Sequence, residues 1–152
     1  MRARVALHVP TLDAGGVEKA CLLLAREFLH LGFDVDLVVL RAEGALAGEV
    51  PSGVRLINLG ARRSLTGLLS LMRYLRHERP TVMIANLGAQ NVSAILARLA
   101  TRVPTRIIAV QHNALTLQTR SGSWQLRLLP FFYRLLLPLA DKVVCVSQGV
   151  AE

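Results

Sequence analysis

The stretch RVALHVPTLDAGGVEKACLLLAREFLHLGFDVDLVV (residues 4–39) decides the fold. It contains two short apolar runs, at 4–9 and 34–40, which are typical of buried strands. Between them, apolar residues recur at the three- and four-residue spacing of an amphipathic helix. The predicted apolar face of this helix consists of Val17, Ala20, Cys21, Leu24, Ala25, Phe28 and Leu29. The stretch therefore predicts a strand–helix–strand unit, with Gly32 as the glycine that ends the helix.

The same alternation continues to the end of the chain. Further strands are predicted at 54–59, 81–86, 106–112 and 142–147. The helices between them are marked by Leu65, Leu68, Leu69, Met72 and Leu75, by Val92, Ile95, Leu96 and Leu99, and by residues 124–140, which Pro130 would kink. Apolar strands separated by helices form parallel sheets that are covered on both faces. The sequence thus predicts one α/β domain over residues 1–152, a Rossmann-like doubly wound parallel sheet with helices on both faces.

Composition favours a globular domain over a membrane-spanning chain. The chain is 53% hydrophobic and has a mean hydropathy of +0.44. Its most apolar stretch, residues 128–140, is interrupted by Arg134 and two prolines and falls short of the roughly 18–20 apolar residues that a span requires. Cys21 and Cys145 lie in apolar segments and are predicted to be reduced core residues, and no histidine stands at a metal-ligand spacing from them.

Charge is divided unevenly along the chain. The net charge is +8, yet residues 1–50 hold 5 Lys and Arg against 7 Asp and Glu, whereas residues 51–152 hold 13 against 3. A basic second part indicates an anionic partner. The charge alone does not distinguish a phosphate, a nucleic acid and an acidic membrane surface. Arg73, Arg76 and Arg79 lie along the predicted leucine helix, away from its leucine stripe. They form either a solvated face or a contact with an anionic acceptor or lipid headgroups.

The candidate site residues lie where predicted strands end, because ligands of doubly wound sheets bind at that edge. Gly15 and Gly16 open the first helix, where free amide groups favour an anion and glycine allows close approach; a tight turn without a ligand is the alternative. His112 ends the fifth strand, either as a structural histidine or as a group that contacts a sugar hydroxyl or a departing phosphate. Arg62 and Arg63 follow the third strand. The dinucleotide fingerprint G-x-G-x-x-G and the phosphate loop ending in Gly-Lys-Ser/Thr are both absent.

The order of these parts resembles the N-terminal half of GT-B glycosyltransferases, most closely the retaining family four, also called group 1. The resemblance rests on GGVEKACLLLAREFLHLGFDVDLVVL (residues 15–40), VQHN (110–113) and ADKVVCVS (140–147), and it covers nearly the whole chain. It implies an acceptor-binding N-terminal domain of an enzyme that transfers sugar from a nucleotide-sugar to a saccharide or lipid-linked acceptor, with retention and without a metal or other cofactor. It also implies a cytoplasmic protein that can lie on the inner face of the cell membrane, in polysaccharide or glycolipid assembly.

The resemblance also implies roles for individual residues. Gly15 and Gly16 correspond to the glycine loop near the donor phosphates and the acceptor, and His112 to the catalytic histidine beside the transferred sugar. The remaining binding residues implied are Asn86, Asn113, Arg62, Arg63 and Ser147. The family's nucleotide-sugar domain, with two glutamates seven residues apart, would follow the last strand, so we expect this half to be inactive alone. The alternatives are a free-standing basic module that binds nucleic acid or anionic membrane, and a nucleotide-sugar epimerase of the same fold; in the transferase hypothesis no nucleic acid is expected.

Overall fold

The computed structural model describes residues 2–112, 131 and 134–146. Its strands are β1 (Arg4–Val9), β2 (Asp34–Val39), β3 (Arg55–Asn58), β4 (Val82–Asn86), β5 (Arg106–Gln111) and β6 (Lys142–Cys145). Its helices are α1 (Gly16–His30), α2 (Leu68–Glu78) and α3 (Gly88–Thr101), with short 3₁₀ turns η1 (Ala47–Glu49) and η2 (Leu137–Leu139). The predicted alternation of strands and helices is confirmed over these residues, while most of the predicted kinked helix at 124–140 lies outside them.

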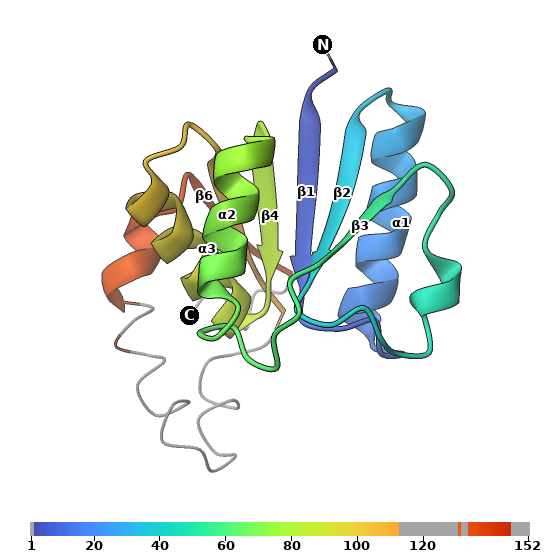
Figure 1. The fold of residues 1–152 in the computed structure, drawn as a ribbon, viewed down its shortest axis with the longest axis horizontal. Coiled ribbons are helices and arrows are strands. Elements are labelled where there is room, and N and C mark those ends of the chain that lie inside the picture. The colour runs from blue at the N-terminus through green and yellow to red at the C-terminus, as the bar shows by residue number, and fades with distance from the viewer. Residues whose placement is uncertain (1, 113–130, 132–133, 147–152) are drawn as a thin grey trace.

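The six strands form one parallel sheet in the order β3-β2-β1-β4-β5-β6. The chain runs outward from β1 to β3, returns to place β4 beside β1, and continues outward on the other side. Figure 1 shows α1 on one side of the sheet and α2 and α3 on the other. This arrangement confirms the doubly wound, Rossmann-like sheet with helices on both faces.

Alternate residues of the central strands β1 and β2 supply two separate hydrophobic cores. Ala6 and Val38 belong to the core beneath α2 and α3, whereas their neighbours Leu7 and Leu37 belong to the core beneath α1. All four side chains are completely buried. Side chains of a strand alternate between the faces of a sheet, so a continuously apolar strand can serve both cores at once.

The buried face of α1 differs from the predicted one. Cys21 and Ala25 are buried as expected, but Ala20 and Leu24 are exposed, and Glu18 and Leu22 are buried instead. The apolar run ACLLLA (residues 20–25) offers every direction around the helix, so its periodicity does not select one face. Gly32 follows the helix at φ +86°, which confirms the predicted glycine stop.

The predicted leucine face of α2 is also wrong in part. Leu65 precedes the helix and is 60% exposed, and Leu69 is 73% exposed. The buried residues are Leu71, Tyr74 and Leu75. Tyr74 is drawn inward because its hydroxyl donates a hydrogen bond to the buried Asp36 on β2, a partner that helix periodicity cannot reveal.

The two cysteines have different environments. Cys21 is buried in the core beneath α1, as predicted, whereas Cys145 is exposed, so its prediction as a core residue is wrong. Cys145 belongs to β6, which pairs with β5 at the end of the sheet and whose four residues are all exposed. An end position of this kind leaves apolar strand residues in contact with solvent.

Candidate functional site at the carboxyl ends of the strands

The strand order places the functional edge between β1 and β4. The chain reverses its direction of winding at this point, and ligands of open α/β sheets bind in the crevice outside the strand ends there. The loop after β1 leads to the N-terminus of α1, and β4 leads directly into α3. In Figure 1 these strand ends and the starts of α1, α2 and α3 lie together at the lower edge.

The paired glycines form the start of α1. Gly15 is the N-cap residue, with φ −90° and ψ 163°, and no side chain caps the helix. A Cβ added to Gly16 would meet no atom within 4 Å, whereas one added to Gly15 would lie 2.1 Å from Oε2 of Glu18. The first amide groups of a helix have no partner within the helix, so this end offers hydrogen-bond donors beside open space at Gly16.

His112 and Asn86 are brought together from adjacent strands. Nε2 of His112 lies 2.9 Å from Oδ1 of Asn86. An amide oxygen only accepts hydrogen bonds, so Nε2 carries the proton and donates it. Asn86 is 2% exposed and its amide nitrogen donates to the carbonyl of Ile84 at 3.4 Å. The structure thus joins two residues that the sequence analysis selected separately.

The imidazole of His112 is held mainly in its neutral form. Burial lowers the pKa of His112, and the nearby negative charge of Glu18 partly opposes that decrease. In a neutral ring with the proton on Nε2, Nδ1 carries the lone pair. The pair therefore presents a hydrogen-bond acceptor whose orientation is set by Asn86.

Leu87 has a backbone conformation that the sequence did not indicate. It lies between Asn86 and the first residue of α3, with φ 73° and ψ 155°. Residues other than glycine adopt this region at a cost of about 1–3 kcal/mol, and they do so mainly at functional sites. Leu87 directly follows Asn86, which pairs with His112. Its strained backbone therefore supports the assignment of this edge as the functional one.

Arg62 and Arg63 lie in the loop between β3 and α2, and both are exposed. The loop is attached to the start of α3 by a hydrogen bond of 2.9 Å from Gln90 Nε2 to Ser64 Oγ. The hydroxyl of Thr66 also donates to the carbonyl of Arg63 at 2.9 Å. The arginines are therefore carried by a loop that is connected to the strand-end edge through α3.

Two of the predicted binding residues, Asn113 and Ser147, lie outside the described residues. A further histidine, His8, lies on β1. His8 is completely buried, and its Nδ1 lies 2.9 Å from the carbonyl of Val38. Burial lowers the pKa of His8 from 6.5 to about 4, although the hydrogen bond to Val38 opposes the decrease. His8 is thus a neutral core residue, which its position at the end of an apolar run did not reveal.

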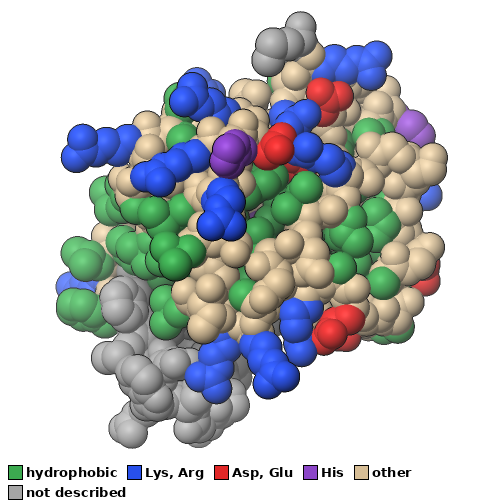
Figure 2. All heavy atoms as spheres, in the orientation of Figure 1, with side chains coloured by type: hydrophobic (Ala, Val, Ile, Leu, Met, Phe, Trp, Pro, Cys, Tyr) green, Lys and Arg blue, Asp and Glu red, His purple; other side chains and the backbone are tan. Residues whose placement is uncertain are grey.

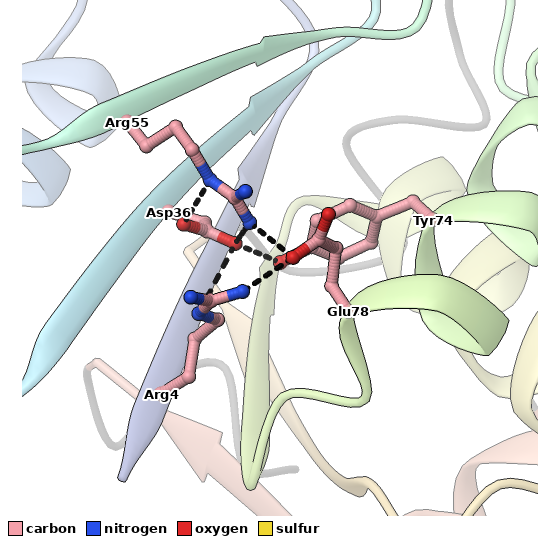
Figure 3. Close-up of polar contacts among 5 residues, drawn as sticks. All are labelled: Arg4, Asp36, Arg55, Tyr74 and Glu78. Atoms are coloured by element: carbon pink, nitrogen blue, oxygen red, sulfur yellow. Dashed lines mark hydrogen bonds and ion pairs between the residues drawn. The ribbon is translucent and has the colours of Figure 1, made fainter. Parts of the chain in front are cut away.

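A polar cluster that the sequence analysis missed connects β1, β2, β3 and α2 (Figure 3). Asp36, which is 2% exposed, accepts two hydrogen bonds from Arg55, at 3.0 and 2.7 Å, and one from Tyr74 at 2.7 Å. Glu78 accepts from Arg55 at 2.6 Å and also from Arg4. Burial and the charge of Asp36 raise the pKa of Tyr74, while the hydrogen bond from Arg55 lowers that of Glu78. We name these five residues the Asp36 cluster. Its signal in the sequence is the alternation of aspartate and apolar residues in DVDLVV (residues 34–39), which marks Asp36 as a strand residue.

Two kinds of feature are absent from the described part of the chain. Within residues 2–112, 131 and 134–146, no three His, Cys, Asp or Glu side chains gather where they could hold a metal ion. None of the helices over the same residues is long and apolar enough to cross a membrane.

Solved structures with this fold include several glycosyltransferases. Sucrose-phosphate synthase from Thermosynechococcus elongatus has a TM-score of 0.68 at 15% identity, with 93% of this chain and 42% of that chain covered. The apo form of the lipopolysaccharide outer core galactosyltransferase WaaB has a TM-score of 0.69 at 12% identity, with coverage of 97% and 40%. MurG of Acinetobacter baumannii has a TM-score of 0.60 at 15% identity, with coverage of 97% and 42%. The chain thus matches about two-fifths of the length of each.

The fold is that of the N-terminal domain of GT-B glycosyltransferases. A family model, the glycosyl transferase 4-like domain, matches residues 15–152. The chain belongs to this family. No curated protein matches the sequence.

Proposed function

We propose that residues 1–152 form the acceptor-side domain of a retaining glycosyltransferase that uses a nucleotide-sugar donor. The family of the chain supports a transferase. The observation that carries the proposal is the convergence of the open start of α1 and the Asn86–His112 pair at the edge where the sheet reverses its winding. In this proposal the domain supplies part of the site, and it has little activity without the donor-binding domain.

The start of α1 suits the phosphate groups of a nucleotide-sugar. Its amide groups and the helix dipole attract an anion. Gly16 adds no side chain to the space in front of these amides, and a larger residue there would project into it. We therefore assign Gly15 and Gly16 to the approach of the donor phosphates.

His112 suits a hydroxyl group of the transferred sugar. Its neutral ring offers Nδ1 as an acceptor, and the hydrogen bond to Asn86 restricts the orientation of the ring. A hydrogen bond from a sugar hydroxyl to Nδ1 would orient the sugar at the strand ends. Asn113 and Ser147 extend this binding role in the proposal, which includes neither a metal ion nor another cofactor.

The surface that we assign to the acceptor, formed by the loop with Arg62 and Arg63 and by α2, is basic and partly apolar. Arg62 and Arg63 suit a phosphorylated or lipid-linked acceptor. Leu69 is 73% exposed and shares the outer surface of α2 with Arg73 and Arg76, which is the composition of a helix that lies on an anionic membrane. Figure 2 shows Lys and Arg side chains gathered over the upper end of α2 and along the lower edge, with hydrophobic side chains between them. We propose a cytoplasmic enzyme at the inner face of the membrane, in the assembly of polysaccharide or glycolipid.

The test is consumption of donor by the complete polypeptide that contains residues 1–152. It is incubated with a panel of nucleotide-sugars and a membrane extract as acceptor, and release of the nucleotide is measured. Gly16→Val and His112→Ala are each expected to reduce turnover by about 100-fold, since the first places a side chain in front of the helix amides and the second removes a positioned hydrogen-bonding group. Gly48→Val and His30→Ala are the matched controls, because Gly48 has the same free space and His30 is exposed at the far end of α1.

Two outcomes would contradict this function. Full turnover in both Gly16→Val and His112→Ala would contradict the assignment of Gly16 and His112 to the site. Failure to consume any donor, combined with salt-dependent binding of random oligonucleotides, would favour the basic binding module instead.

A further inference from the structure

Gly44 lies in the loop that follows β2, against the loop that leads from β1 to α1. Its φ is +125°, which favours glycine. A Cβ at this position would lie 2.3 Å from both C and O of Leu12 and 2.5 Å from N of Asp13. These are backbone atoms, which can move only together with the chain. Gly44 therefore packs directly against the peptide unit that joins Leu12 to Asp13.

Backbone hydrogen bonds attach the same two loops to each other. The N–H of Leu12 donates to the carbonyl of Glu43 at 2.9 Å, and the N–H of Leu46 donates to the carbonyl of Leu12 at 2.8 Å. The N–H of Leu40 also donates to the carbonyl of Pro10 at 3.0 Å. The side chains of Leu12 and Leu46 are buried in the core beneath α1. The loop after β1 is thus held by the loop after β2 at its backbone and in the core.

The peptide unit that Gly44 contacts leads directly to the start of α1. The N–H of Gly15 donates to the carbonyl of Asp13 at 2.7 Å, which makes residues 13–15 a tight turn. The carbonyl of Gly15 in turn accepts a hydrogen bond of 3.1 Å from the N–H of Lys19 in the helix. A displacement of the contacted peptide unit would therefore move the N-cap residue and the first turn of α1.

Two other glycines separate the effect of this contact from the effect of the dihedral angle. Gly32 and Gly53 also have positive φ, at +86° and +97°. A Cβ at Gly32 would meet nothing within 4 Å, and one at Gly53 would meet only the side chain of Leu29, at 3.5 Å. Alanine at these positions would carry the strain of a positive φ alone. At Gly44 it would also displace the backbone of the neighbouring loop.

We propose that Gly44 is a positioning residue for the candidate site: the absence of a side chain lets the loop after β2 close against Leu12 and Asp13 and thereby fixes the start of α1. Its effect on sugar transfer rests on the proposed function, in which the start of α1 meets the donor phosphates. Its effect on the position of that start is independent of the proposed function and is measured without a transfer assay.

The position of the start of α1 is measured by NMR on the complete polypeptide that contains residues 1–152, with isotope-labelled glycine. The amide signals of Gly15 and Gly16 are identified by their loss when each residue is replaced by alanine. Gly44→Ala should shift both signals, because the new Cβ displaces the peptide unit that leads to them. Gly53→Ala is the matched control with a similar φ, and it should leave both signals in place. Native positions of both signals in folded Gly44→Ala would overturn the proposal.

Leu46→Val tests the same attachment if Gly44→Ala does not fold. It keeps Gly44 and shortens the side chain that holds the loop after β2 in the core beneath α1. The signals of Gly15 and Gly16 should shift in this variant too. Leu29→Val makes the same change near the far end of α1, against the same core, and should leave both signals in place. Unshifted signals in Leu46→Val would then overturn the proposal.

The consequence for transfer is measured separately in the complete enzyme. Gly44→Ala should raise the KM for the nucleotide-sugar by about tenfold and change kcat less, because a contact with the donor phosphates is made both before and during transfer. Gly53→Ala should change neither constant. Shifted signals with an unchanged KM would support the positioning role of Gly44 and contradict the assignment of the start of α1 to the donor. Shifted signals in a protein that consumes no donor would contradict the transferase proposal and support the positioning role.

Discussion

At the scale of single residues, the environment of each histidine determines its chemistry. His112 lies half-buried at a strand end and is oriented by Asn86, whereas His8 is enclosed in the sheet. Both have a lowered pKa because burial disfavours the charged ring. Only His112 lies where it can meet a ligand, and His8 instead affects stability.

His8 makes the stability of the fold dependent on pH. The pKa is about 4 in the folded chain and 6.5 when the ring is exposed, so the unfolded chain binds more protons between these values. Stability is fully present above pH 6.5, and it decreases as the pH falls, by about 3 kcal/mol in total once the pH is below 4. Urea unfolding at pH 7 and pH 4.5 should show this loss, and His8→Leu should reduce the difference. An unchanged difference in His8→Leu would assign the pH dependence to other groups.

At the scale of elements, α2 presents two different faces. Its inner face buries Leu71, Tyr74 and Leu75, and its outer face exposes Leu69 beside Arg73 and Arg76. A leucine beside two arginines on an exposed helix surface has the composition of a helix that lies on an anionic membrane. The helix is therefore the element on which membrane attachment depends in our proposal.

Vesicle binding tests this role of α2. Leu69→Gln combined with Arg73→Gln and Arg76→Gln should weaken sedimentation with phosphatidylglycerol vesicles by at least about tenfold, since each basic residue contributes about 1 kcal/mol near an anionic surface. Leu23→Gln on α1, where the leucine is 54% exposed, is the matched control and should bind normally. The melting temperature should change little in either protein. Equal loss of binding in both would contradict a specific role for α2.

At the scale of the whole molecule, the Asp36 cluster connects three strands to a helix far along the chain. Asp36 on β2 meets Arg55 on β3 and Tyr74 on α2, and Glu78 joins Arg4 of β1 to the same group. Figure 3 shows these side chains converging between the strands and α2. The buried carboxylate accepts hydrogen bonds from β3 and α2, so its removal would leave the buried hydroxyl of Tyr74 without this partner.

Replacement of Asp36 should therefore destabilise the entire domain. Asp36→Asn is expected to reduce the free energy of unfolding by about 2 kcal/mol, because the amide weakens the charge-assisted hydrogen bonds from Arg55 and replaces an acceptor oxygen near the buried Tyr74 hydroxyl. Glu43→Gln removes the exposed ion pair with Arg41, of 2.8 Å, and should change stability by less than about 1 kcal/mol. Urea denaturation measures both. A similar small effect at Asp36 would mean that solvent replaces the lost carboxylate.

The sequence alone predicted the arrangement of the chain and several residues of the candidate site. The order of strands and helices, the helix stop at Gly32 and the strand-end positions of Asn86 and His112 are local signals, and the structure agrees with each of them. They are local because side-chain alternation and helix stops depend on a few neighbouring residues. A doubly wound sheet then brings its strand ends together through topology.

Only the tertiary structure decided which polar residues are buried and which helix faces are covered. The inward positions of Glu18, Tyr74 and Asp36, and the strained backbone of Leu87, depend on partners 3 to 38 residues away or on the junction of two elements. Periodicity records which residues are apolar and does not record which polar group has a partner. The burial of a polar group is favourable only when that partner is present, so it could not be determined before the fold brought the partners together.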